Sequence, residues 1–322
     1  MPGIVSRTVK QVAQLSNIAT PSPITAKKLC AEANYGYCGA VAPGVELVLA
    51  KNPKEYTGPG TNTYIVGTDA VWIVDPGPAC TAHVDTVLAA VAGRTVAGIL
   101  VSHSHLDHSP AATLISRKVN AKIYGFGALS RDILAFTQED IDADFSPDIA
   151  LADGHLIGEG DWQVMALHTP GHFPNHMAYY LPHKGILFSG DHVMGWSTTV
   201  VVPPLGNMAE YLASLDKLEH LGAHLMLPSH GLEVANPGGR ICEVREHRAM
   251  RQAQVEACVE KGVSDPATIV AEIYDDLPAR LILAAQGCVA AHLEFMPRED
   301  KESLLSDVAG IQGATSSIPN CG

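Results

Sequence analysis

The 322-residue sequence predicts an α/β protein in which two β-sheets pack together with helices outside, a four-layer αββα sandwich. Short strand-like segments come first and then alternate with helix-like segments in two similar halves. After about residue 239 the strand pattern stops, and three helix-like segments follow. The predicted organisation is an N-terminal extension at 1–43, the sandwich at 44–239, a helical domain at 240–296 and a mobile tail at 297–322.

The first half of the sandwich is predicted from short apolar runs separated by Gly- and Pro-rich turns. Before it, residues 8–18 could form a short helix, and the Gly- and Ala-rich stretch 35–44 is expected to be irregular. The predicted strands are 45–49, 63–67, 71–75 and 96–101, with a helix at 83–92. The strands at 63–67 and 71–75 should form an antiparallel pair.

The second half repeats the alternation and leads into the helical domain. It is predicted to contain helices at 110–119 and 207–221, strands at 121–125, 163–167 and 225–227, and hairpins at 148–160 and 178–188. The helical domain is predicted to contain helices at 240–262, 265–273 and 281–296. A proline at the first turn favours the second of these helices.

Composition limits the classes of function. A hydrophobic content of 47% fits a globular chain, and no apolar run approaches the length of a membrane span. The net charge of −13 argues against a broad phosphate-binding surface. Seven irregularly spaced cysteines without a CxxC pair favour reduced thiols and a cytoplasmic protein rather than a disulfide framework.

The densest group of metal-binding side chains is the His-Ser-His-Leu-Asp-His motif at 103–108, which follows the buried strand 96–101. Side chains that alternate on a strand and spread out in the following loop can converge on one point. Imidazole nitrogens and carboxylate oxygens are ligands that suit zinc and similar divalent metals. His103, His105, Asp107 and His108 are therefore predicted metal ligands.

Three further candidate ligands follow strands later in the chain: His172, Asp191 and His230. Each lies in a Gly- or Pro-shaped loop, where the backbone can approach closely. Ligands carried by four strand ends on one rim of a sandwich would form a single metal cleft. Eight other histidines are interpreted as structural, and His168 and His192 are expected to form hydrogen bonds beside the ligands. The eight are His83, His155, His176, His183, His220, His224, His247 and His292.

The sequence resembles the metallo-β-lactamase-fold hydrolases, through the HxHxDH cluster followed by His172, Asp191 and His230 in that order. The resemblance implies two divalent metal ions. One would be held by His103, His105 and His172. The other would be held by Asp107, His108 and His230, with Asp191 bridging. Zinc is the expected metal, and iron and manganese accept the same ligands.

A closer resemblance, over roughly 45–296, is to the β-lactamase-like protein 2 subgroup. It is carried by the segments 60–64, 190–196 and 203–204. The resemblance implies a winged-helix-like C-terminal domain, and the best-understood members are endoribonucleases that cleave single-stranded RNA. Two residues depart from the family pattern, Ser229 in place of Gly and Phe173 in place of Thr, and both lie next to ligands. The candidate substrate-pocket residues are Asn62, Tyr64, Phe173 and Trp196.

The predicted mechanism uses a metal-activated hydroxide that attacks a carbonyl carbon or a phosphorus atom, with Asp107 and Asp191 as the catalytic carboxylates. The favoured function is hydrolysis of a small ester, lactone, thioester or amide, with β-lactam cleavage as a side activity. The negative charge and the apolar loop after Asp191 support it. That loop contains Trp196, Val200, Val201, Val202 and Leu205.

Two alternatives remain open. The first is cleavage of single-stranded RNA, for which Arg240, Arg245, Arg248 and Arg251 would provide a basic surface. The aromatic content of 6% offers few stacking platforms for such a ligand. The second is a metal-binding module without catalysis, which the complete ligand set disfavours. A small-molecule substrate is the expected partner, with no membrane involvement, and the oligomeric state is left open.

Overall fold

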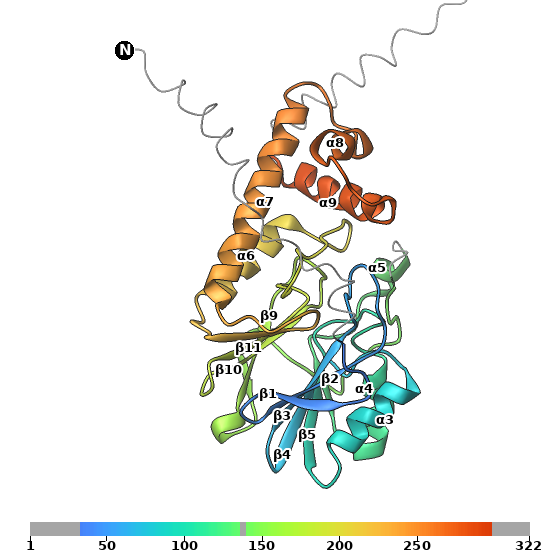
Figure 1. Ribbon diagram of the computed structural model, residues 1–322, viewed down its shortest axis with the longest axis vertical. Helices are drawn as coiled ribbons and strands as arrows, with labels where there is room; N and C mark the ends of the chain where they lie inside the picture. Colours follow the sequence, from blue (N-terminus) through green and yellow to red (C-terminus); the bar gives the residue numbers. More distant parts are fainter. Residues whose placement is uncertain (1–32, 136–139, 298–322) are drawn as a thin grey trace, which may run out of the picture.

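The computed structural model describes residues 33–135 and 140–297. Two β-sheets face each other, helices lie on their outer sides, and a helical domain extends from one end (Figure 1). The predicted helix at 8–18 and nearly all of the predicted tail at 297–322 lie outside the described residues. No helix among the described residues is both long and apolar enough to cross a membrane.

The first sheet has seven strands that follow one another in sequence order. They are β1 (Cys38–Ala42), β2 (Val45–Leu49), β3 (Asn62–Gly67), β4 (Ala70–Val74), β5 (Thr95–Leu100), β6 (Ile123–Gly125) and β7 (Ile149–Ala150). Strands β1 to β4 are antiparallel, and β4 to β7 are parallel. Parallel neighbours need crossover connections. Helices α3 (Thr81–Ala90) and α4 (Ala111–Val119) provide the first two, and α5 (Arg131–Ala135) follows β6.

The second sheet has five strands in the order β12-β11-β10-β9-β8. They are β8 (His155–Ile157), β9 (Val164–His168), β10 (Met177–Leu181), β11 (Ile186–Gly190) and β12 (Leu225–Pro228), with a short 3₁₀ helix, η2 (Gly160–Trp162), between the first two. Only β11 and β12 are parallel, and α6 (Met208–Glu219) forms their crossover. The side chain of Asn207 caps α6 by accepting a hydrogen bond from the backbone of Glu210.

Three apolar clusters separate the layers. The one between the sheets includes Tyr64 of β3 and Phe188 of β11, whose ring centroids lie 5.3 Å apart. A second cluster lies between the first sheet and helices α3 and α4. A third packs α6 onto the second sheet. The four-layer αββα arrangement is therefore confirmed.

The helical domain contains α7 (Pro237–Val259), α8 (Pro266–Ile273), the 3₁₀ helix η3 (Ala279–Leu281) and α9 (Ile282–Phe295). Asn236 and Asp265 cap the two helices that begin with proline. Helix α7 belongs to two cores, because Ile241 packs with the sandwich whereas Val255 packs with α8 and α9. The proposed boundary at 239 therefore falls in the first turn of this helix.

Two local predictions were wrong. Stretch 35–44 contains β1, which pairs with β2 from Cys38 opposite Val48 onwards. Gly and Ala, which are depleted in strands, make up half of this stretch, so the pairing with β2 decides its structure. The stretch 148–160 is not a hairpin, because β7 belongs to the first sheet and β8 to the second. The segment between them carries the chain from one sheet to the other.

Buried His83 makes the stability of the first sheet depend on pH. Its Nε2 lies 3.1 Å from the carbonyl oxygen of Pro76 and 2.9 Å from Thr63 Oγ1, and its Nδ1 has no hydrogen-bond partner among the described residues. Burial lowers the pKa of His83 to about 4 from 6.5. The unfolded chain therefore binds an extra proton between these values, so this contribution to stability falls as the pH drops from about 6.5 to about 4, by at most roughly 3 kcal/mol.

The variant His83→Gln should be less stable than the wild type at pH 7.5, and the difference should shrink towards pH 4.5. Denaturant unfolding at a series of pH values measures it. The exposed His155→Gln provides the control, since its side chain is solvated in both states. A His83→Gln difference that does not change with pH would contradict the assignment.

Candidate metal centre

The predicted ligands are carried by loops that leave the strands of both sheets at one edge of the sandwich. The segment 103–108 follows β5 of the first sheet, and His172, Asp191 and His230 follow β9, β11 and β12 of the second. An isolated bridge between Thr61 and His230 joins the two sheets at this edge. Because the two sheets face each other, the loops that carry the predicted ligands meet at this edge.

The structure brings all seven predicted side chains into one cluster. The potential ligand atoms lie within 4.8 Å of one another in each of three groups, which are His103 with His105 and His172, Asp107 with His108 and His230, and His103 with His108 and Asp191. Asp191 lies between the first two groups. Its carboxylate oxygens are 3.3 Å from His230 Nε2, 3.5 Å from His108 Nε2 and 3.8 Å from His172 Nε2.

The donor set fits divalent metal ions. His108 Nε2 and Asp191 Oδ1 are buried, and neither forms a hydrogen bond within the described part of the chain; each instead faces another candidate ligand, with Asp107 Oδ1 3.4 Å from His108 Nε2 and His230 Nε2 3.3 Å from Asp191 Oδ1. Native proteins rarely leave such atoms unsatisfied without a functional reason. Imidazole and carboxylate groups are also the ligand types that zinc, iron and manganese share. Each of the first two groups offers three protein ligands, which is the number typical of catalytic zinc sites.

The carboxylates and imidazoles of the cluster form charge pairs, in which the imidazoles carry the protons. Burial opposes charge on Asp191, but the imidazoles of His230 and His108 hold the pKa of this carboxyl well below its usual range. Burial likewise opposes charge on His230, but Asp191 and Asp107 raise the pKa of this imidazole to about 10. Metal binding would release these imidazole protons, so the affinity for metal should increase with pH.

Asp75, which follows β4, fixes the orientation of His108. Its Oδ2 accepts hydrogen bonds from His108 Nδ1 at 3.0 Å, Ser102 Oγ at 2.8 Å and Ser229 Oγ at 2.5 Å, and its Oδ1 accepts one from the backbone of Ser102 at 2.7 Å. The hydrogen bond to Nδ1 directs Nε2 of His108 towards the cluster. Asp75 is not among the predicted site residues. A carboxylate at the end of a buried strand, followed by Pro-Gly-Pro, was the available signal.

Other ligands are oriented through the backbone. The Nδ1 atoms of His172 and His230 lie 2.7 Å and 3.0 Å from the carbonyl oxygens of Val200 and Gly60. His176, interpreted as structural, is buried beside the cluster, and its Nε2 accepts a hydrogen bond from the backbone of Asp191. His168 and His192 instead contact the carbonyl oxygens of Pro174 and Tyr211.

The two departures from the family pattern both support ligand geometry. Ser229 binds Asp75, as described above, and so links the end of β12 to the end of β4. The ring of Phe173 is fully buried, with its centroid 4.2 Å from that of His105 and 5.6 Å from that of His103. Phe173 therefore lies behind the ligands and packs against their rings.

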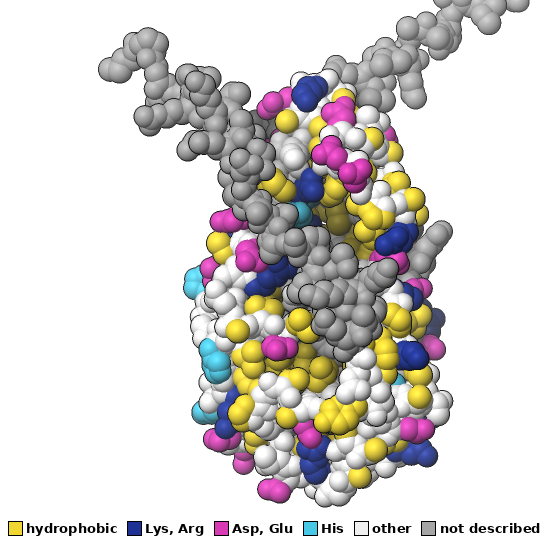
Figure 2. Space-filling view, viewed as in Figure 1, with side chains coloured by type: hydrophobic (Ala, Val, Ile, Leu, Met, Phe, Trp, Pro, Cys, Tyr) yellow, Lys and Arg dark blue, Asp and Glu magenta, His cyan; other side chains and the backbone are white. Residues whose placement is uncertain are grey.

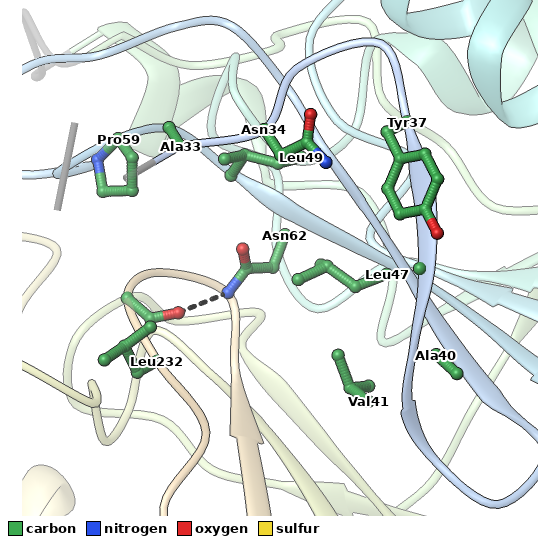
Figure 3. A pocket seen from close by; sticks show the side chains of 12 residues that line it. Ala33, Asn34, Tyr37, Ala40, Val41, Leu47, Leu49, Pro59, Asn62 and Leu232 are labelled. Atoms are coloured by element: carbon green, nitrogen blue, oxygen red, sulfur yellow. Dashed lines mark hydrogen bonds between the residues drawn. The ribbon is translucent and has the colours of Figure 1, made fainter. Parts of the chain in front are cut away.

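The other candidate substrate-pocket residues differ in position. Asn62 and Tyr64 are buried, and both donate hydrogen bonds to the carbonyl oxygen of Pro228, which braces the loop that carries His230. Asn62 also binds the carbonyl oxygen of Gly231 at the wall of a cavity of about 280 Å³ (Figure 3). Trp196 lines a separate cavity between the sandwich and the helical domain.

Comparisons with known proteins agree with this architecture. Residues 56–230 match the family described as metallo-beta-lactamase superfamily, and residues 266–301 match the beta-lactamase associated winged helix domain. An atrochrysone carboxyl ACP thioesterase from Aspergillus fumigatus is 27% identical over 74% of this chain and 76% of its own length. A beta-lactamase-like protein 2 homolog from Caenorhabditis elegans is 28% identical, covering 80% and 86%. The crystal structure of a beta-lactamase domain protein from Burkholderia ambifaria has a TM-score of 0.67 and 25% identity, covering 82% and 89%.

Replacing the carboxylate that orients His108 should weaken metal binding. In Asp75→Asn the side chain keeps its size but loses its charge, so the affinity for zinc should fall by about 10–100-fold. Competition with a chromogenic chelator measures the affinity. Asp161→Asn is the matched control, because it removes an exposed carboxylate that pairs with Lys184 and does not belong to the cluster. Equal zinc affinities for Asp75→Asn and the wild type would show that Asp75 does not orient a ligand.

Proposed function

The chain belongs to the metallo-β-lactamase superfamily and is a hydrolase with a C-terminal winged-helix domain, and we propose that it hydrolyses acyl thioesters. The observation that carries the proposal is the convergence of seven buried or half-buried ligand side chains from both sheets. The thioester class is supported by the names of several relatives, which are called ACP thioesterases. This is one of the substrate classes that the sequence analysis favoured.

The proposed metal ligands form two adjacent sets. His103, His105 and His172 would hold one divalent cation, and Asp107, His108 and His230 would hold a second, with Asp191 shared between them. Zinc is the first metal to test, with iron and manganese as alternatives. Bound cations supply a Lewis acid for the thioester carbonyl and lower the pKa of water towards neutrality.

The protein side chains have separate tasks in this scheme. Asp191 is nine-tenths buried and would orient the attacking water from between the two sets. Asp107 has a more exposed side chain, at 25%, and Thr61 Oγ1 donates a hydrogen bond to its Oδ2 at 3.3 Å. The exposure leaves the Asp107 carboxylate open to solvent, so we assign it the acceptance of a proton from the attacking water and the transfer of that proton towards the leaving thiolate.

The apolar loop after Asp191 has a narrower role than the sequence suggested. Val201 and Leu205 are buried, and Val201 packs into the core over the second sheet. Trp196 and Val200 line the cavity below the helical domain. The wall offered to a substrate by this loop is therefore formed by residues 196–200.

The arginines that favoured RNA cleavage do not form an exposed basic surface. Arg248 is only 3% exposed. Arg245 forms ion pairs with Asp216 and Glu219, and Arg240 donates to the carbonyl oxygen of Met194 and pairs with Glu243. A groove that follows a nucleic acid backbone needs exposed cations. These residues do not form one, and the comparisons give the RNA alternative no support.

Replacing the shared carboxylate should remove thioesterase activity. Asp191→Asn retains the shape of the side chain but not its charge, so kcat/KM for an acyl thioester should fall by more than about 100-fold. The assay follows release of the free thiol, and metal content is measured in parallel. The exposed Asp161→Asn should behave like the wild type.

Unchanged turnover in Asp191→Asn would refute the proposed centre. If the wild type loaded with zinc, iron or manganese cleaves labelled single-stranded RNA but no thioester, the substrate class proposed here is wrong.

A further inference from the structure

A cavity of about 230 Å³ lies between the sandwich and the helical domain. Loop 196–200 forms one wall, and α7, α9 and the segment after α8 form the others. In Figure 2 hydrophobic side chains gather in a hollow below the helical domain, with basic and histidine side chains near its edge. The side chains that line the cavity include the polar groups of Trp196, Arg248, Arg251, Tyr274, Cys288 and His292, together with those of Glu55, Tyr56, His247 and residues 197–199.

Three fixed N–H donors in this wall have no acceptor. The Nε atoms of Arg248 and Arg251 and the Nε1 of Trp196 are buried and form no hydrogen bond with any described residue. Arg248 is 97% buried as a residue, since its exposed fraction is 3%. An unsatisfied buried donor costs about 1–3 kcal/mol, and a charged one costs more. Several such donors beside one cavity are unusual in a native protein and call for an explanation.

The two guanidinium groups also lack a counter-charge. Arg248 donates to the carbonyl oxygen of Thr199, and Arg251 donates to that of Ile273 at 3.0 Å and to Gln254 Oε1 at 2.8 Å. All three acceptors are uncharged. No carboxylate among the described residues forms an ion pair with either arginine, and the nearby Glu55 pairs with Arg280.

The histidines of the cavity do not offset this charge. Burial and the neighbouring Arg248 lower the pKa of His292 to about 3 and that of His247 to about 4, so both are neutral at pH 7. The cavity therefore has one buried and one half-buried positive charge, each over a tyrosine ring (Tyr211 and Tyr274), and no negative charge on its wall apart from the paired Glu55 at its rim. Buried charges without partners are strongly unfavourable, which an anionic ligand would relieve.

Loop 196–200 connects this cavity to the metal centre. Val200 lines the cavity, and its carbonyl oxygen contacts His172. Thr199, on the same wall, donates to the backbone carbonyl of Asp191 through Oγ1. The indole of Trp196 packs so closely against Gly231, the residue after His230, that an added Cβ there would lie 2.4 Å from it. The loop thus has ligands on one side and the cavity on the other.

We propose that this cavity binds an oxyanion carried by the thioester substrate, with Arg248 and Arg251 as the binding cations and Trp196 as a further donor. The inference rests on the proposed thioesterase function. The oxyanion could be a phosphate on the thiol side, as in a phosphopantetheine arm, or a carboxylate at the end of the acyl group. Both present several acceptors to guanidinium groups. Apolar residues such as Val255 and Val289 would contact the attached methylene chain.

Three matched substrates test the proposal and identify the source of the oxyanion. They are S-hexanoyl-pantetheine, which is uncharged, S-hexanoyl-4′-phosphopantetheine, and S-adipoyl-pantetheine, which has a terminal carboxylate. For the wild-type zinc enzyme, KM for one anionic substrate should lie about 10–100-fold below KM for the uncharged substrate. In Arg251→Gln the ratio between KM for the uncharged substrate and KM for that anionic substrate should fall towards 1. Arg245→Gln removes an arginine from the same helix outside the cavity and should retain the advantage.

The outcomes separate this proposal from the proposed function. Equal KM values for all three substrates in the wild type would overturn the oxyanion site but leave the thioesterase assignment intact. An equal loss for all three in Arg251→Gln would indicate a packing role instead. If no thioester is hydrolysed, calorimetry with free 4′-phosphopantetheine, pantetheine and adipate tests directly whether the protein binds the anion. Binding of an anion by the wild type and Arg245→Gln but not by Arg251→Gln would support the site, and no binding would refute it.

Because Arg248 is deeply buried, its replacement could prevent folding. Arg248→Lys therefore serves as the second variant, since it keeps the charge but loses the planar fork of donors. It should weaken the preference for the anionic substrate, and unchanged preference in both Arg248→Lys and Arg251→Gln would contradict the assignment.

Discussion

The carboxylate of Asp75 ties the two sheets together at the metal centre. It lies at the end of β4, and its hydrogen bonds reach Ser102 after β5, His108 in the ligand motif and Ser229 after β12. Asp75 itself has a φ of 48°, which is uncommon for a residue other than glycine, and its backbone amide still donates to Leu100. Such a conformation persists when the surrounding structure determines it. The position of His108 and the distance between the ends of β4, β5 and β12 therefore depend on one buried anion.

The same arrangement explains how many like groups can be buried together. The ring of His103 is buried among three other ligand imidazoles, and burial together with His108 and His105 holds its pKa well below the usual range. Burial also opposes charge on His108, but Asp107, Asp191 and Asp75 raise the pKa of His108 well above its usual range, and the charge on His108 helps to keep His103 neutral. Several of the candidate ligands are held by groups outside the set: His108 by a carboxylate, His172 by a backbone carbonyl and His105 by the ring of Phe173. Ligand side chains that are already held in place lose little conformational entropy when they bind metal.

The clustering of the seven candidate ligands could be predicted from the sequence because each follows a strand within a short loop, and the strand pattern indicates that these strand ends lie on one rim. Contacts such as that between Asp75 and Ser229, 154 residues apart, leave no local pattern, so the role of Asp75 was missed. The spacing of the arginines along the sequence indicates a basic face on α7. The backbone carbonyls that accept hydrogen bonds from these arginines, such as those of Thr199 and Ile273, come from distant segments and could not be predicted. Strand β1 was missed for a related reason, because pairing with β2 outweighs its weak local preference.

Helix α7 connects the chemistry of the sandwich to the recognition proposed for the helical domain. Its first turns pack through Ile241 and Val244 onto the core over the second sheet, and its later turns carry Arg248, Arg251 and Val255 into the cavity. Because an α-helix fixes the spacing of its side chains, the arginines have a set distance from the sheet whose strand ends carry His172 and Asp191. Loop 196–200 fills the space between them and contacts both. A substrate that reached both sites would need a matching distance between its anionic group and its thioester. The helical domain could therefore select the substrate, while the sandwich supplies the metal ligands.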